Sequence, residues 1–168
     1  MTLVKVRSRG INLADDFAFT GTITGAGKIL SVNTAQVTDS TTGNNTSYAE
    51  HDTDLRVSVT PQSTSSKFLI EYNTKTRQTD TSRYTEIRFY KSVAGGSYSG
   101  IEHTTQIFHG LNVTISDGHL SLVAKCIHSP STTSALIFTP YVKVNSGDWE
   151  LGSRAAQSQT TMVVTEFE

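Results

Sequence analysis

Hydrophobic and polar side chains alternate along much of the chain. In residues 55–61, Leu55, Val57 and Val59 fall on one side of an extended backbone and polar residues fall on the other. A period of two residues is typical of a strand that buries one face. No helical period continues beyond a turn or two, so the pattern predicts an all-β protein. Further strands are expected at 67–75, 83–91, 111–116, 119–128, 134–144 and 160–168.

Turn signals separate these strands. Asp117-Gly118 lies between two alternating segments, which is a strong hairpin signal. Gly95-Gly96 follows the strand at 83–91, and residues 145–148 (NSGD) break the last hairpin. Many short strands at this spacing predict a two-sheet antiparallel β-sandwich, jelly-roll-like in its arrangement.

The first residues of the chain have a different character. Residues 10–30 are apolar but rich in Gly and Thr, and GAG ends at residue 27. We therefore divide the chain into an extended N-terminal arm, residues 1–27, and a β-sandwich domain, residues 28–168. Exposed apolar side chains would form an adhesive patch, so the arm is expected either to wrap neighbouring protomers or to dock onto another protein. In the alternative, the arm is an extra strand of its own sandwich. The expected contact residues are Ile11, Leu13, Phe17, Phe19 and Ile23.

Composition narrows the class of partner. The chain has 14 basic and 15 acidic residues, so no net charge favours nucleic acid or an anionic membrane surface. No apolar run approaches the roughly 20 residues that a membrane helix needs, and no membrane insertion is expected. Cys126 is the single cysteine, which rules out an intrachain disulfide. Its apolar strand face indicates a core residue and not a nucleophile.

Three segments carry a resemblance to a known class of protein. They are GKILSV at the start of the domain, LRVSVTPQSTSSKFLI at 55–70 and TTMVVTEFE at the C-terminal end. Together they resemble the C-terminal jelly-roll-like domains of bacteriophage virion proteins, mostly marine, which occur in tail fibres and capsid decoration proteins. The resemblance covers residues 10–70 and the last ten or so. It implies a β-domain that is commonly trimeric, and it implies no enzymatic activity.

Motifs for catalysis or cofactor binding are weak. GAGK at 25–28 lacks the first Gly and the Ser/Thr of a phosphate-binding loop, and GSYSG at 96–100 has Tyr98 where a nucleophilic Ser belongs. The five histidines lack a short two-ligand spacing, although a threefold axis could bring three copies of one histidine together. Asp52 and Asp54 are better explained as a solvated strand start than as a catalytic pair. No metal and no cofactor are predicted.

Two groups of side chains could serve a ligand. Lys75, Arg77, Arg83 and Arg88 could form a basic edge for an anionic sugar or a viral partner, or an edge that discourages strand pairing. Tyr84, Tyr90, Tyr98 and Trp149 could line a sugar platform, or fill cross-strand positions. The residues expected to face a ligand from loops are Arg77, Arg83, Tyr98 and Trp149.

The leading expectation is a non-enzymatic structural protein of a phage virion, made in the bacterial cytoplasm. It would be a homotrimeric knob joined to the capsid or tail through its arm. The alternative is a module at the tip of a tail fibre that binds a host receptor or cell-surface glycan through loops such as 40–53, 76–83 and 95–105, since rigid scaffolds present binding loops. A polysaccharide hydrolase is a third class, but the sequence shows no converging carboxylates for it.

Overall fold

The computed structural model describes residues 28–77, 84–109, 120–152 and 159–168. The predicted arm, the predicted strand at 111–116 and the Asp117-Gly118 turn lie outside these residues. Within them, every regular element is a strand except a single 3-10 turn at Thr53–Leu55. None of these residues belongs to a helix long and apolar enough to cross a bilayer.

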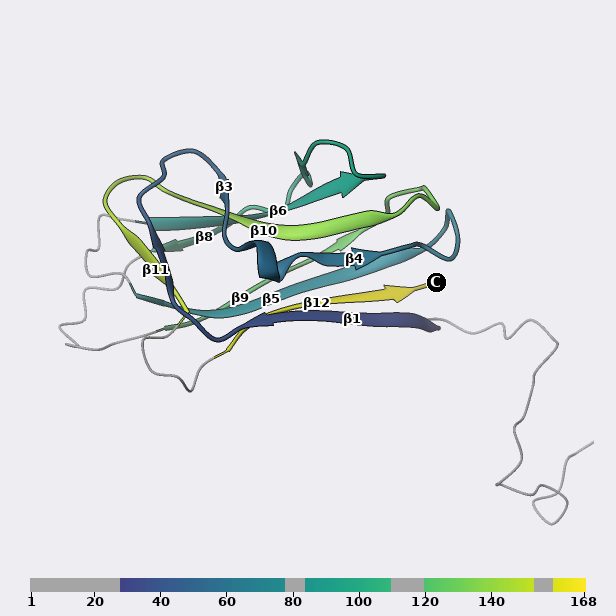
Figure 1. Cartoon of the computed structure of the whole chain (residues 1–168), viewed down its shortest axis with the longest axis horizontal. Coiled ribbons are helices and arrows are strands. Elements are labelled where there is room, and N and C mark those ends of the chain that lie inside the picture. The colour runs from purple at the N-terminus through teal and green to yellow at the C-terminus, as the bar shows by residue number, and fades with distance from the viewer. Residues whose placement is uncertain (1–27, 78–83, 110–119, 153–158) are drawn as a thin grey trace, which may run out of the picture.

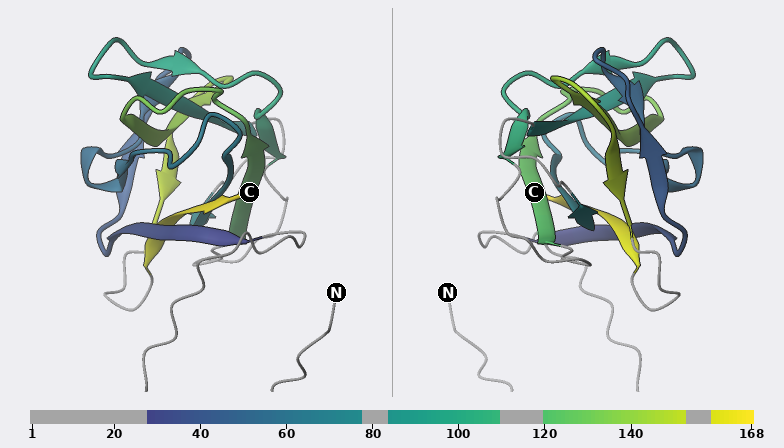
Figure 2. Two further views of the ribbon diagram at one scale, coloured as in Figure 1. Left: turned by 90° about the vertical axis from the view of Figure 1, so that its right-hand side faces the viewer. Right: turned by 90° about the vertical axis from the view of Figure 1, so that its left-hand side faces the viewer.

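Two antiparallel sheets stack face to face (Figure 1; end-on in Figure 2). The first sheet contains β1 (Ile29–Val37), β2 (Thr41–Gly43), β5 (Lys67–Arg77), β9 (Leu120–His128), β11 (Trp149–Leu151) and β12 (Thr160–Phe167). The second contains β3 (Ala49–Glu50), β4 (Val57–Val59), β6 (Tyr84–Val93), β7 (Ser99–Gly100), β8 (Gln106–His109) and β10 (Leu136–Val144).

The order of the longer strands is that of a jelly roll. In the first sheet β1 pairs with β12, β12 with β5, and β5 with β9. In the second, β4 pairs with β10, β10 with β6, and β6 with β8. The chain passes between the sheets at most connections, so eight strands are interleaved in two layers. The prediction of an all-β, two-sheet antiparallel sandwich is confirmed.

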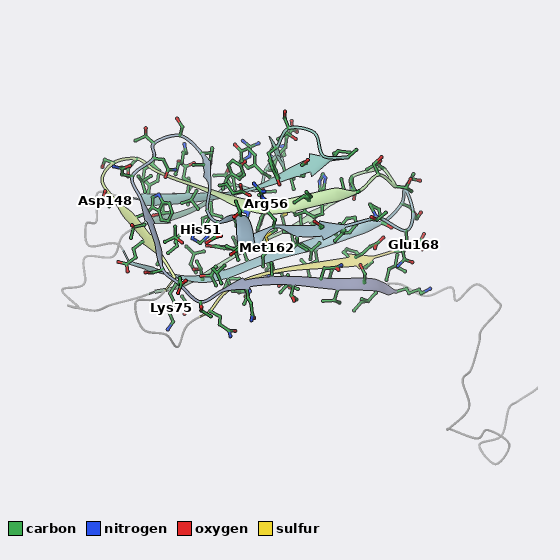
Figure 3. All side chains as sticks on the ribbon, viewed as in Figure 1. His51, Arg56, Lys75, Asp148, Met162 and Glu168 are labelled. Atoms are coloured by element: carbon green, nitrogen blue, oxygen red, sulfur yellow. The ribbon has the colours of Figure 1, made fainter. Side chains whose placement is uncertain are left out.

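The core lies between the sheets, where the alternation seen in the sequence directs apolar side chains inward. Phe68 of β5 and Phe138 of β10 are fully buried, and their ring centroids lie 5.5 Å apart across the two layers. Met162 also lies between the sheets (Figure 3). Burying one large apolar side chain contributes about 1.5–3 kcal/mol. The inward-facing rows of β5, β10 and β12 therefore hold the two layers together.

The motif VTPQSTSSK forms the turn between β4 and β5, and a buried carboxylate organises it. Glu166 of β12 is 1% exposed. Its Oε1 accepts hydrogen bonds from the Gln62 amide (2.7 Å) and the Ser66 hydroxyl (2.7 Å), and its Oε2 accepts one from the Ser31 hydroxyl (3.2 Å). A buried carboxylate needs such donors to offset its lost hydration. The serines of this turn thus tie the β4–β5 connection to the last strand.

The two ends of the described domain lie side by side. The Glu168 amide donates to the Lys28 carbonyl oxygen (3.1 Å), just outside the pairing of β1 with β12. Residues 1–27 therefore join the domain beside its C-terminal end.

Candidate functional site

Four partly exposed tyrosines gather on the outer face of the second sheet: Tyr48, Tyr90, Tyr98 and Tyr141. We call them the tyrosine cluster. Tyr90 of β6 and Tyr141 of β10 point outward because strand residues alternate, while their neighbour Phe89 is fully buried. Tyr48 immediately precedes β3 and Tyr98 immediately precedes β7, so two loops complete a group whose centre is held by the sheet.

The four rings form a continuous run. The centroids of Tyr90 and Tyr141 are 3.8 Å apart with an interplanar angle of 15°, which is a stacked pair. Tyr48 lies 6.0 Å from Tyr90, and Tyr98 lies 6.2 Å from Tyr141, both tilted. Offset and tilted contacts of this kind are favourable for aromatic rings. The stack fixes the two central rings, and the tilted outer rings widen the aromatic surface.

An ion pair between Arg56 and Glu50 borders one side of the tyrosine cluster. Arg56 donates from Nε (2.7 Å) and Nη2 (2.6 Å) to the two carboxylate oxygens of Glu50, and Thr139 donates to the same carboxylate (2.9 Å). The Arg56 guanidinium lies 5.2 Å from the Tyr98 ring centroid, within range of a cation–π contact. Hydrogen bonding to Glu50 raises the pKa of Arg56. The pair therefore positions a permanent cation over Tyr98 (Arg56 is labelled in Figure 3).

A second ion pair borders the other side. Glu86 accepts a hydrogen bond from the Tyr48 hydroxyl (2.6 Å) and forms an ion pair with Lys143 (3.2 Å). The Lys143 ammonium lies 4.9 Å from the Tyr48 ring centroid. Burial, with this hydrogen bond, raises the pKa of Tyr48 to about 12. Tyr48 therefore remains a neutral hydrogen-bond donor at physiological pH.

Arg88 contributes a third cation beside the cluster, on the same face of β6 as Tyr90. Its Nε donates to the Ile101 carbonyl oxygen (3.2 Å), and its guanidinium lies 5.9 Å from the Tyr90 ring centroid. A Cβ on Gly100 would approach that guanidinium to 2.7 Å, so glycine allows β7 to pass close to Arg88. In the described part of the chain Arg88 has no carboxylate partner.

The chemistry of this group is that of a binding surface. Burial raises the pKa of Tyr98 and of Tyr141, so both phenols are neutral near pH 7. Glu50 accepts hydrogen bonds from Arg56 and Thr139, and Oε2 of Glu86 contacts both Tyr48 and Lys143, which orients the two carboxylates. The surface offered to a ligand combines aromatic rings with phenolic hydroxyl groups and cations.

The structure brings together part of the predicted ligand-facing set. Tyr98 belongs to the tyrosine cluster, as does Tyr90 of the predicted sugar platform. Arg83 and the arm residues lie outside the described residues, and only the backbone of Arg77 is described. Tyr84 lies at the start of β6. For these residues the sequence-based hypothesis stays a prediction.

The prediction for Trp149 is wrong. Its side chain is 4% exposed and its ring lies 5.7 Å from that of His51 inside the sandwich. Its Nε1 donates to Asn45 (3.0 Å). Trp149 begins the short strand β11, which pairs with β2, and a Cβ on the facing Gly43 would approach the indole to 2.6 Å. Trp149 is therefore a core residue that reaches the interior across a glycine.

Lys75 and Arg88, the two members of the predicted basic edge whose side chains are described, do not share one surface. Lys75 lies on β5 in the first sheet, whereas Arg88 lies on β6 in the second and contacts the tyrosine cluster. The sequence places these residues close together, but the chain crosses from one sheet to the other between them. Their charges therefore belong to different faces of the molecule.

The other candidates have structural roles. Asp52 caps the 3-10 turn by accepting a hydrogen bond from the Asp54 amide (2.8 Å). Cys126 packs against the core, and burial raises the pKa of its thiol to about 12. Among residues whose positions are described, no three His, Cys, Asp or Glu side chains group as metal ligands would.

Sequence reasoning missed Tyr141 and Tyr48. Tyr141 shares the outer side of β10 with Thr139 and Lys143, so a search for aromatic residues among the polar positions of each strand could have found it. Tyr48 lies in a loop whose position no periodicity predicts.

Comparisons with known proteins add little to this description. No family model matches the chain, and no curated protein matches it either. Among solved structures with a related arrangement is Eiger TNF from S. frugiperda, with a TM-score of 0.48 and 8% sequence identity, over 79% of this chain and 90% of that one. We draw no functional conclusion from a likeness this distant.

Proposed function

We propose that the chain is a non-enzymatic surface protein that binds carbohydrate through the tyrosine cluster. The observation that carries the proposal is the stacked pair Tyr90–Tyr141, extended by Tyr48 and Tyr98 on the outer face of a rigid sheet. A pyranose ring has an apolar face of C–H groups and an edge of hydroxyl groups. Tyrosine offers both an aromatic ring and a polar hydroxyl, and it does so with little loss of side-chain entropy.

The polar groups around the rings suit such a ligand. Arg56 and Lys143 lie at the two ends of the cluster, each held by a carboxylate. Because these charged side chains are already held in place, they can orient a ligand with little further loss of side-chain entropy on binding. The arrangement therefore combines a shallow aromatic surface with hydrogen-bonding groups at its borders, which fits an extended glycan better than a small enclosed ligand.

The setting that we propose for this activity is a bacteriophage particle, made in the bacterial cytoplasm. The support is the sequence resemblance of GKILSV, VTPQSTSSK and the last strand to phage virion domains. In that setting the chain would be a homotrimeric decoration or fibre protein, joined to other capsid or tail proteins through residues 1–27. A reconstruction of an intact particle that resolves this chain, its neighbours and its symmetry tests the assignment.

A glycan array with the full chain tests the binding function, followed by calorimetry on any hit. Tyr141→Ala should weaken binding at least tenfold, because truncating an aromatic residue at the centre of a binding surface typically costs about 2 kcal/mol or more. Lys125→Ala, at an exposed position of β9 in the other sheet, is the control and should bind as the parent does. Absence of any specific glycan, or equal binding by the Tyr141 variant, would refute the proposal.

A second candidate function is purely structural: a virion decoration protein with no ligand. The observation that favours it is a group of exposed hydrophobic side chains on the first sheet, far from the tyrosine cluster. Stabilisation of purified particles by the added protein, without glycan binding, would support this reading over the first.

A further inference from the structure

The outer face of the first sheet carries large hydrophobic side chains in the described domain. Ile29 (63% exposed), Val32 (57%), Val123 (53%) and Ile127 (64%) are each more than half exposed. They come from β1 and β9, the two outer strands of the main four-stranded part of this sheet. We call this surface the apolar face.

The strand register makes the apolar face continuous across the sheet. Val32 of β1 pairs with Thr165 of β12, Thr165 with Leu69 of β5, and Leu69 with Ile127 of β9. One transverse row therefore contains three large hydrophobic residues and a threonine. Single exposed apolar residues are normal, but a contiguous row of them marks a contact surface.

The N-terminal arm joins the domain at the rim of the apolar face. Lys28 directly precedes Ile29, which is part of the face, and it is held beside the C-terminal end by the Glu168 amide. The arm sequence supplies matching chemistry, with Ile11, Leu13, Phe17, Phe19 and Ile23. From Ile11 to Ile23 an extended chain spans about 40 Å. Four strands are only about 14 Å across, so the segment is long enough to cover the row.

We propose that the apolar face receives residues 11–23 of a neighbouring copy of this chain. The direction of β1 favours a neighbour over the chain's own arm. β1 pairs with β12 from Ile29 onward, and Lys28 is held beside Glu168, so the described chain enters the sheet along the strand axis. To cover the apolar face of its own domain, the arm would have to reverse direction within residues 24–27. To reach the apolar face of another copy, it needs no such reversal. This contact lies on the opposite sheet from the tyrosine cluster and does not depend on carbohydrate binding.

Cysteine cross-linking of full-length chains tests the contact. In a Cys126→Ser background, chains carrying Phe19→Cys are co-expressed with chains that carry Val123→Cys and a tag of different mass, and the complex is then oxidised. We expect a disulfide-linked heterodimer of defined mass. The control replaces Val123→Cys with Ile107→Cys, which is equally exposed at 53% but lies on β8 of the other sheet. The control should give little heterodimer.

The possible results separate the occupants of the apolar face. If one chain with both Phe19→Cys and Val123→Cys forms an internal disulfide, and the mixed chains form none, the face holds its own arm and the proposal is wrong. If neither experiment gives a disulfide, the arm does not occupy the face at all, and the proposal is also wrong.

A second measurement does not depend on cysteine geometry. Val123→Lys should raise the concentration at which the full chain dissociates by about tenfold or more, because it places a charge in an apolar contact. Ile107→Lys should leave the mass unchanged, as measured by analytical ultracentrifugation. Circular dichroism reports whether either variant is folded. A folded Val123→Lys chain with the parental mass at every concentration would overturn the proposal.

Discussion

Acidification from pH 7 to pH 5 should destabilise the sandwich through His51, whose side chain lies in the interior (Figure 3). His51 is 5% exposed. Its Nδ1 is 3.0 Å from the Tyr72 hydroxyl, and its Nε2 has no hydrogen-bond partner within the described residues. The rings of Tyr72 and Trp149 contact it edge-on, at 5.9 and 5.7 Å. A protonated imidazole would therefore be a charge buried among aromatic rings.

The magnitude follows from the pKa. Burial lowers the pKa of His51 from 6.5 to about 4, so the native state keeps the imidazole neutral where the unfolded state binds a proton. The neutral imidazole imposes no cost on the free energy of unfolding well above pH 6.5. As the pH falls toward 4, protons bind the unfolded state preferentially and the free energy of unfolding decreases. Linkage of the two pKa values gives a loss of about 2 kcal/mol between pH 7 and pH 5. That is a substantial part of the 5–15 kcal/mol that usually stabilises a domain.

Urea unfolding at the two pH values measures the effect. The effect is read from the difference between the free energies of unfolding at pH 7 and pH 5. A substitution also changes stability by altering packing, but that change is nearly the same at both pH values and cancels in the difference. His51→Gln should reduce this difference by about 2 kcal/mol. His103→Asn is the control, because His103 is exposed and Asn tolerates its left-handed backbone (φ 58°).

His128 adds to the same pH dependence and must be measured separately. Burial and the nearby Lys91 ammonium lower the pKa of His128 to about 4, and its Nε2 lies 2.9 Å from Lys91 Nζ. The group is only partly buried, so its contribution is smaller. The reasoning fails if His51→Gln keeps the full pH dependence, or if NMR titration of the parent shows His51 protonated by pH 5.5.

Three further predictions concern the core and its borders. Glu166→Ala should lower the free energy of unfolding by about 3 kcal/mol, because donors of the turn at 62–66 lose their acceptor, and Glu166→Gln should cost less; urea unfolding that ranks the two variants equally would contradict this. Gly43→Ala should cost about 1–3 kcal/mol, since the new methyl group overlaps Trp149, and the same assay would refute the contact if the change were neutral. Cys126 should react with a thiol reagent at pH 8 much more slowly in the folded than in the urea-unfolded chain, because burial raises its pKa to about 12; equal rates would show that the thiol is open to solvent.

The candidate site could be predicted only in part. Tyr90 and Tyr98 were recognisable as members of an aromatic surface, since each lies at a polar strand position or near a turn. The sequence also suggests Trp149 for this surface, and there the prediction is wrong because the side chain is buried. Its burial depends on Gly43, more than a hundred residues earlier in the chain, and on the pairing of β11 with β2. No local pattern contains that information.

Local patterns in the sequence are enough to specify the class of this fold. The period of two in β5, β10 and β12 selects the inward-facing residues, and the glycine-containing turns after β6 and β10 separate the strands. Both are local properties of the backbone and its side chains. Tertiary structure alone decided which strands are neighbours, and with them the stacking of Tyr141 on Tyr90, the burial of Trp149 and the row from Val32 to Ile127. These contacts join segments distant in sequence, and their register depends on the packing of the whole sandwich.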